Sequence, residues 1–145
     1  MTANAFMSGS LEPPLIIVSV GRRARMHAIL ESAGVFGVTV LTCEQEGHSR
    51  WFAGHAGRPE HAPPAAFTRL NDAPVLSGGN ASLAARVAHR YPCGDHTLFV
   101  GAVEALEVDE GARPPLLFYA GRYAHVDPGD FSGMREAIPA PPFLY

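Results

Sequence analysis

Ionisable and hydrogen-bonding side chains gather at three places in the sequence, and one of these is a turn that leads into an apolar strand. Cys93-Gly94-Asp95 is a tight-turn signal, and His96 stands where the turn passes into the apolar run 97–101. Strand pairing would fix the backbone here while the tip stays open, so a histidine at this point can be held toward a ligand. The alternative is that the turn is ordinary and that His96 is a half-exposed structural residue.

Arginine residues crowd the second place, between an apolar run and a segment with helical spacing. Arg22, Arg23 and Arg25 lie there, and a helix N-terminus with neighbouring guanidinium groups is a favourable site for a phosphate. The competing interpretation of this arginine run is a solvated charged surface.

The third place is the start of the chain, where hydroxyl and amide side chains occur at Thr2, Asn4, Ser8 and Ser10.

Other kinds of site find little support. His48, His55 and His61 have no regular ligand spacing, so no metal site is expected. The sequence contains neither a Gly-x-Ser-x-Gly turn nor a glycine-rich dinucleotide fingerprint. The formal net charge of −3 gives no general affinity for nucleic acid. Two cysteines, no membrane-length apolar run and no signal peptide together predict a cytoplasmic protein without a membrane partner.

The elements that must position these groups are short strands and two helices. Strands are predicted over residues 15–20, 36–42, 75–76, 83–91, 96–108 and 116–119, and helices over 24–33 and 44–52. Residues 1–12 and 53–74 are expected to be loops, the latter anchored by Phe67 and Leu70. The predicted fold class is therefore mainly β, a small antiparallel barrel with short helices, formed by a chain of 145 residues that has room for one core.

Three side-chain patterns refine this prediction. The spacing of Met26, Ile29, Leu30 and Ala33 predicts one apolar helical stripe, ended by Gly34. Trp51 and Phe52 are expected to pack inward from the second helix. Strict alternation would put one set of side chains on a single face of the strand 83–91, namely Leu83, Ala85, Val87, His89 and Tyr91.

Five segments, taken in order, resemble the motifs of the flavin reductase-like family. Residues 1–15 are similar to its T-x-[NS]-S-F-x-S-x-S-[LF]-[DE]-P-P-L pattern, and Arg25-Met26-His27 resembles its R/K-x-S-x-T-H element. Trp51-Phe52-Ala53-Gly54 resembles R-F-A-G, and residues 94–101 resemble the hairpin motif G-D-H-x-[IL]-F-[VI]-G. Residues 116–123 resemble the P-L-L-[YF]-x-x-G-x-Y end. Together the five segments cover nearly the whole chain.

The resemblance implies a fold and an activity. The fold would be an FMN-binding split barrel, antiparallel and of Greek-key type, over residues 1–127, with a Pro-rich extended tail over 128–145. The family's usual preceding segment, with a P-x-G-V-T strand, would be missing. The activity would be hydride transfer from NADH or NADPH to FMN or FAD, with the reduced flavin passing to a partner monooxygenase. A homodimer is expected, because an unpaired sheet edge needs cover, which the apolar end Phe143-Leu144-Tyr145 could help to supply.

The resemblance also implies roles for individual residues. His96 would be catalytic, on the nicotinamide side of the flavin. Residues near the start of the chain would line the isoalloxazine ring and ribityl chain, namely Thr2, Ala3, Asn4, Ala5, Phe6, Ser8 and Ser10. The flavin phosphate would face Arg22, Arg23, Arg25 and His27, while Gly121 and Tyr123 would close the ring pocket.

The chain departs from the family pattern at several positions, and the departures leave two other functions open. Ala5 stands where a serine is usual, and Ala24 and Met26 stand where hydroxyl groups often meet the phosphate. Each lost hydrogen bond is worth about 1 kcal/mol. One alternative is a non-catalytic flavin- or haem-binding module on the same barrel. The other is a dimeric remnant that binds neither.

Overall fold

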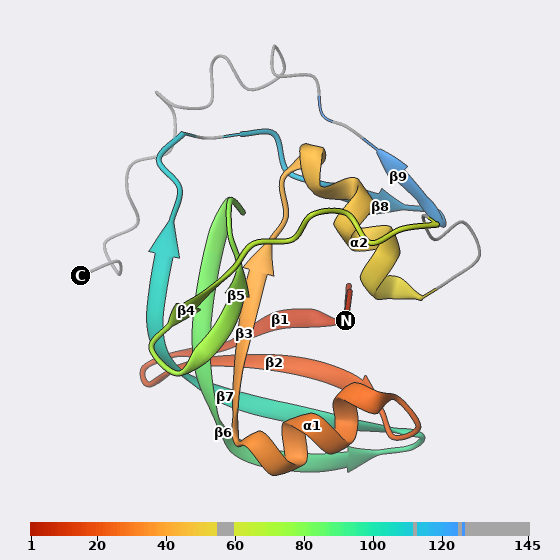
Figure 1. Cartoon of the computed structure of the whole chain (residues 1–145). Coiled ribbons are helices and arrows are strands. Elements are labelled where there is room, and N and C mark those ends of the chain that lie inside the picture. Colours follow the sequence, from red (N-terminus) through yellow and green to blue (C-terminus); the bar gives the residue numbers. More distant parts are fainter. Residues whose placement is uncertain (55–59, 112, 125, 127–145) are drawn as a thin grey trace.

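A five-stranded antiparallel sheet forms the centre of the molecule, with the strand order β1-β2-β7-β6-β3 (Figure 1). The computed structural model describes residues 1–54, 60–111, 113–124 and 126. The sheet consists of β1 (Phe6–Leu11), β2 (Pro14–Gly21), β3 (Val35–Val40), β6 (Ala81–Cys93) and β7 (His96–Val108). Two hairpins accompany it: β4 (Phe67–Leu70) with β5 (Ala73–Leu76), and β8 (Leu117–Tyr119) with β9 (Arg122–Ala124).

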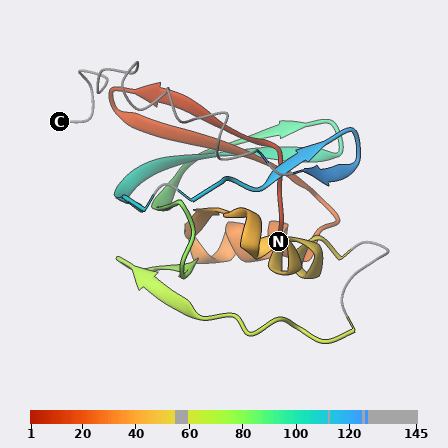
Figure 2. The same cartoon turned by 90° about the horizontal axis from the view of Figure 1, so that it is seen from above.

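The helices are α1 (Arg25–Ala33) and α2 (Glu46–Ala53), and a 3₁₀ turn at Cys43–Gln45 leads directly into α2. Both helices lie on the same side of the large sheet (Figure 2). The predicted fold class, mainly β with short helices, is confirmed. Neither helix in the described part of the chain has the length and apolar character needed to cross a membrane.

The core lies between the helix side of the large sheet and α1. Alternate residues of β2 point into it, because successive strand side chains face opposite ways: Ile16, Val18 and Val20 are buried. Phe99 of β7 is fully buried beside them, and Leu30 covers them from α1. The strand predicted over residues 15–20 is thus confirmed. Its other residues point to the opposite face of the sheet, away from α1.

Helix α1 confirms the predicted helix and corrects its apolar stripe. Gly34 ends the helix in a left-handed conformation with φ 69°. Leu30 is buried and Met26 packs against the core, but Ile29 is 50% exposed. Neighbouring residues of an α-helix differ by about 100° around the axis, so Ile29 lies on the flank when Leu30 faces inward.

Three other expectations are corrected. Residues 6–11 form β1 instead of a loop, because they pair with β2, with an irregularity between Ser8 and Ser10. Phe52 is exposed, and its ring meets the exposed Phe67 edge-on at 6.0 Å. The loop predicted over 53–74 contains β4, although Leu70 is buried as expected. Short polar strands carry little local signal, since a partner strand decides whether they form.

Strand β6 is longer than predicted and does not alternate regularly. Its register shifts between Ala84 and Ala85 and again between Val87 and His89. Val87 therefore packs against the core, whereas His89 pairs with Val100, so the two side chains do not share a face. Strand 96–108 agrees with its predicted bounds, and residues 122–124 add β9 after the predicted strand. The predicted tail, 128–145, lies outside the described residues.

Candidate functional site

An open pocket of about 280 Å³ lies where β2 passes into α1. Its lining consists of Gly21, Arg22, Arg23, Ala24 and Asp95. The Arg22 amide donates to the Asp95 carbonyl at 2.9 Å, and the Ala24 amide donates to the Gly21 carbonyl at 2.9 Å. These bonds fix the loop backbone, while the side chains of Arg22 and Arg23 are exposed.

The N-terminus of α1 adds positive potential beside this pocket. Its N-cap residue is Ala24, which has no side-chain acceptor, and the first turn contains no acidic residue. Arg25, the first helical residue, is exposed. A helix N-terminus carries a partial positive charge, and here it adds to the neighbouring guanidinium groups. The pocket is therefore suited to an anion such as a phosphate.

His96 is not part of this lining, but it contacts two residues that are, Asp95 and Gly21. Its Nδ1 lies 2.8 Å from Asp95 Oδ1, and this hydrogen bond, together with the charge of the imidazole, holds the pKa of the exposed Asp95 below its ordinary value. Gly21 is the residue opposite His96 in the β2–β7 pair. A Cβ atom at Gly21 would lie 3.6 Å from His96 Nε2, so the ring lies over a backbone without a side chain.

A second, largely apolar pocket of about 180 Å³ follows the first along the β2–β7 pair. It is lined by Asn4, Ala5, Phe6, Met7, Ile17, Ser19 and Leu98. On β7, Leu98 lies two residues after His96. On β2, Ser19 pairs with Leu98 and lies two residues before Gly21. Residues two apart on a strand share a face and are about 7 Å apart. One face of the β2–β7 pair thus links an anion pocket to an apolar pocket.

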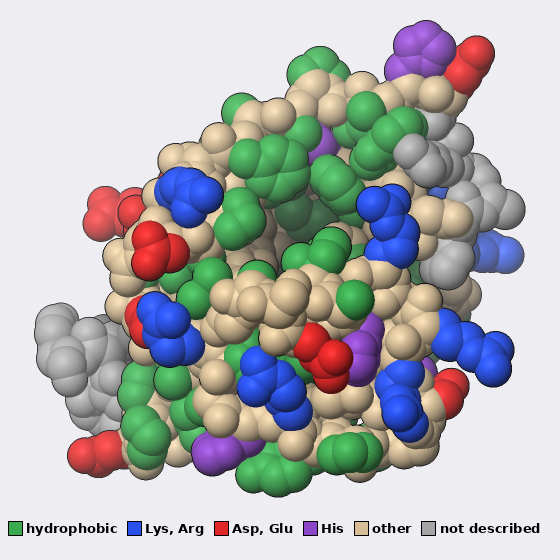
Figure 3. All heavy atoms as spheres, turned by 60° about the horizontal axis from the view of Figure 1, so that its bottom comes forward, with side chains coloured by type: hydrophobic (Ala, Val, Ile, Leu, Met, Phe, Trp, Pro, Cys, Tyr) green, Lys and Arg blue, Asp and Glu red, His purple; other side chains and the backbone are tan. Residues whose placement is uncertain are grey.

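Figure 3 brings the bottom of Figure 1 forward and shows one face of the molecule as spheres. Hydrophobic side chains surround a central hollow on this face, and separate arginine side chains lie on the surface around it. Apolar and cationic surfaces are thus close neighbours on this side of the protein.

Tyr123 lies against α2. Its hydroxyl is 2.9 Å from Ser49 Oγ, and the Arg50 guanidinium lies 4.5 Å from the centre of its ring. Arg50 also forms an ion pair with Glu46, one turn earlier, at 2.6 Å. The hydroxyl of Thr2 donates to the Ser49 carbonyl at 2.6 Å. Sequence reasoning missed Ser49 and Arg50, although the Glu46–Arg50 spacing of four residues was a visible helical signal.

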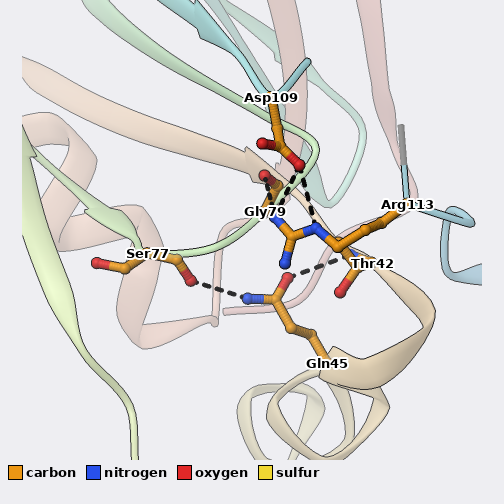
Figure 4. Close-up of polar contacts among 6 residues, drawn as sticks. All are labelled: Thr42, Gln45, Ser77, Gly79, Asp109 and Arg113. Atoms are coloured by element: carbon orange, nitrogen blue, oxygen red, sulfur yellow. Dashed lines mark hydrogen bonds and ion pairs between the residues drawn. The ribbon is translucent and has the colours of Figure 1, made fainter. Parts of the chain in front are cut away.

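Hydrogen bonds connect the residues before α2 to the turn at residues 77–79 (Figure 4). Gln45 Nε2 donates to the Ser77 carbonyl at 3.0 Å, while its Oε1 accepts from the Thr42 amide at 3.1 Å. Arg113 binds the same turn: it donates to Asp109 Oδ2 at 3.0 Å and to the Gly79 carbonyl at 3.3 Å. The turns around Ser77 and Gly79 are thereby tied to the segments that flank α2.

His27 has a packing role in the structure. Its Nε2 lies 2.8 Å from Thr97 Oγ1, and its ring meets Phe99 edge-on at 5.4 Å. Only 12% of the side chain is exposed. These contacts tie α1 to β7, and His27 is not among the residues that line the pocket of Arg22 and Arg23.

The remaining predicted residues occupy three different places. Asn4, Ala5 and Phe6 line the apolar pocket. Ser8 and Ser10 lie further along β1, opposite Ile16 and Leu15, and outside the lining of either pocket. Ala3 is exposed beside Thr2, and Gly121 forms the exposed β8–β9 turn with φ 77°. The structure therefore gathers part of the predicted residues into two clusters, one along β2 and β7 and one against α2, and it leaves Ser8, Ser10 and His27 outside both.

Comparison with known proteins identifies relatives over most of the chain. A family model described as a flavin reductase like domain matches residues 1–127. An NADH-dependent flavin reductase from Rhodococcus sp is 42% identical over 127 residues, which are 88% of this chain and 69% of that protein. The reductase component of 4-hydroxyphenylacetate 3-monooxygenase from Thermus thermophilus is 42% identical over 123 residues, covering 85% and 76%.

Solved structures agree with these matches. The flavin reductase PheA2 in its native state superposes with a TM-score of 0.79 at 35% identity, covering 86% of this chain and 78% of that one. The styrene monooxygenase flavin reductase from Pseudomonas putida S12 superposes with a TM-score of 0.75 at 38% identity, again covering 86% and 78%.

Proposed function

The chain belongs to the family of flavin reductase like domains, and on that premise we propose that it holds its flavin along the β2–β7 pair. It is an oxidoreductase with a split-barrel fold that uses NADH to reduce FMN or FAD. When bound, the flavin accepts the hydride of the nicotinamide, and the cofactors carry that chemistry. The protein's own residues bind, orient and shield the two reactants.

The donor set of the first pocket fits a flavin phosphate. Arg22 and Arg23 present guanidinium groups, and the uncapped N-terminus of α1 lies beside them. Arginine binds phosphate oxygens with paired, directional hydrogen bonds. These groups would hold the phosphate even though Ala24 and Met26 offer no hydroxyl.

The second pocket suits the flat, largely apolar ring system. Phe6, Ile17 and Leu98 supply its apolar lining, and Asn4 supplies an amide that can donate to a ring carbonyl. Ligand sites of this kind combine an apolar lining with a few placed polar groups. We extend the site to Ala3, Ser8, Ser10, Arg25 and Gly121 as its outer members.

We propose that His96 orients the nicotinamide. Asp95 accepts the hydrogen bond from Nδ1, which fixes the plane of the imidazole and directs Nε2 toward Gly21. Because Gly21 has no side chain, the space beside Nε2 is available to a flat ligand. His96→Ala should therefore lower kcat for NADH oxidation, and unchanged kcat would contradict the role.

The continuity of the two pockets along one pair of strands carries the proposal. Its test is steady-state NADH oxidation with FMN and with riboflavin, which lacks the phosphate. Replacing both Arg22 and Arg23 by alanine should raise the KM for FMN by about tenfold or more and leave the KM for riboflavin unchanged. Arg69→Ala is the matched control, since Arg69 is exposed on β4 and bonds its own turn. No NADH oxidation above the free-flavin background would contradict the function itself.

The reduced flavin passes to a partner oxygenase, in line with the relatives that are reductase components of monooxygenases. A cytoplasmic location is proposed with it, since Cys43 and Cys93 are free thiols. We also propose that residues 1–127 are the catalytic domain and 128–145 a tail.

A homodimer is proposed from the outer face of the large sheet. Met7 is 59% exposed at the edge strand β1, and Ile17, Leu98 and Tyr91 continue an apolar surface on the same face. Since Met7, Ile17 and Leu98 also line the apolar pocket, the second copy would pack over the flavin ring and close this pocket. Exposed edges and apolar patches of this kind are usually covered. Met7→Asp should shift the protein toward monomer in sedimentation equilibrium. A wild-type protein that is monomeric at micromolar concentration would refute the proposal.

A further inference from the structure

We propose that Ser49 is a positioning residue of the flavin site, because it bonds both Tyr123 and Thr2, and Thr2 lies two residues before Asn4 of the apolar pocket. This inference rests on the proposed function. Ser49 lies outside the motifs that carry the resemblance. We assign it no direct contact with the flavin. Its role is to hold two chain segments that are far apart in sequence in one arrangement.

Ser49 contacts both segments from the buried side of α2. It is 2% exposed, its Oγ lies 2.9 Å from the Tyr123 hydroxyl, and its carbonyl accepts the Thr2 hydroxyl at 2.6 Å. The partners are separated from it by 74 and 47 residues of sequence. The Thr2 amide adds a bond to the Phe52 carbonyl at 3.3 Å, so the start of the chain is held at two points on α2.

The Tyr123 ring is held on several sides. Arg50 covers one face of the ring, and Phe118 meets it edge-on at 5.1 Å. These contacts set the position of the ring plane, and the hydroxyl is hydrogen-bonded to Ser49. Ser49 is therefore the residue that sets the rotation and depth of the tyrosine relative to α2.

The base of α2 is itself fixed, so Ser49 can act as a rigid reference. Gln45, directly before the helix, joins Thr42 to Ser77, and Arg113 joins Asp109 to Gly79 in the same turn (Figure 4). A binding wall that is already ordered loses less conformational freedom when a ligand arrives. We expect the Ser49 contact to strengthen flavin binding by this means.

A double-mutant cycle tests the coupling. Ser49→Ala and Tyr123→Phe each remove one side of the same hydrogen bond, and FMN dissociation constants are measured by flavin fluorescence. Each single variant should weaken FMN binding about three- to tenfold, and the double variant should be no weaker than either single one. Ser32→Ala is the control: its hydroxyl bonds the Ile29 carbonyl on α1, away from both pockets, and its dissociation constant should equal that of the wild type.

The melting temperature of each flavin-free variant separates positioning from stability. The inference would be overturned if the Ser49→Ala variant had a lower melting temperature but the same FMN dissociation constant as the wild type. Effects that multiply in the double variant would also overturn it, since the two residues would then act independently. A wild-type protein that binds no FMN would instead refute the proposed function, and the inference would fall with it.

Discussion

The contact between His27 and Thr97 gives the sharpest test of how α1 is attached to the sheet. Thr97→Val keeps the shape and β-branching of the buried strand residue and removes the hydroxyl that lies 2.8 Å from His27 Nε2. The imidazole is left against Phe99 without this partner in a site where only 12% of its side chain reaches solvent. The variant therefore isolates one buried hydrogen bond between α1 and β7.

The expected cost is that of an unsatisfied buried polar group, about 1–3 kcal/mol. For a domain of this size, 1 kcal/mol lowers the melting temperature by about 3 °C, so the expected shift is about 3–9 °C. Binding of FMN well below the melting temperature should change little, because Arg22 and Arg23 keep the backbone bonds of their own loop.

The assay is thermal and urea unfolding of the flavin-free protein followed by circular dichroism, with FMN binding measured in parallel. Ser32→Ala serves as control, because its exposed hydrogen bond lies on the same helix. Unchanged stability of Thr97→Val would refute the argument that this bond ties α1 to the sheet. A large loss of FMN affinity at full stability would show instead that His27 acts in binding.

Three further outcomes are expected. Gly101→Ala should destabilise the fold by about 1–3 kcal/mol in urea unfolding, because its Cβ would lie 2.6 Å from Phe36 Cζ; a neutral result would contradict the tight packing. Gly47→Ala on α2, with nothing within 4 Å of its Cβ, should instead stabilise the protein by about 0.5–1 kcal/mol. In NMR titration, the Asp95 carboxyl should titrate below its ordinary pKa, and His96→Gln should raise that pKa toward the ordinary value of an aspartate. The stabilising Asp95–His96 contact is thus present above the ordinary carboxyl pKa and is lost as the pH falls through the lowered one; equal titration in both proteins would contradict the pairing.

Local patterns were sufficient for the strands and helix that build the β2–β7 face. The continuous apolar, β-branched run along 15–20 and the run from His96 to Val108 are properties of neighbouring residues, as is the Gly34 stop after α1. The anion pocket was predictable for the same reason. Its arginines follow one strand and precede one helix, so proximity in sequence ensures proximity in space.

Contacts between residues far apart in sequence determine the features that the local patterns did not predict. Residues 6–11 become a strand because β2 offers them a partner, and the register shift between Val87 and His89 sends these two side chains to opposite faces. His27 stands beside Arg25 in the sequence, but Thr97, 70 residues away, draws its side chain inward. Ser49 bonds Thr2 and Tyr123, 47 and 74 residues away, because the fold places α2 between them. Residue type and short spacing govern which elements form, whereas contacts between distant residues depend on how those elements pack, and no local pattern records that packing.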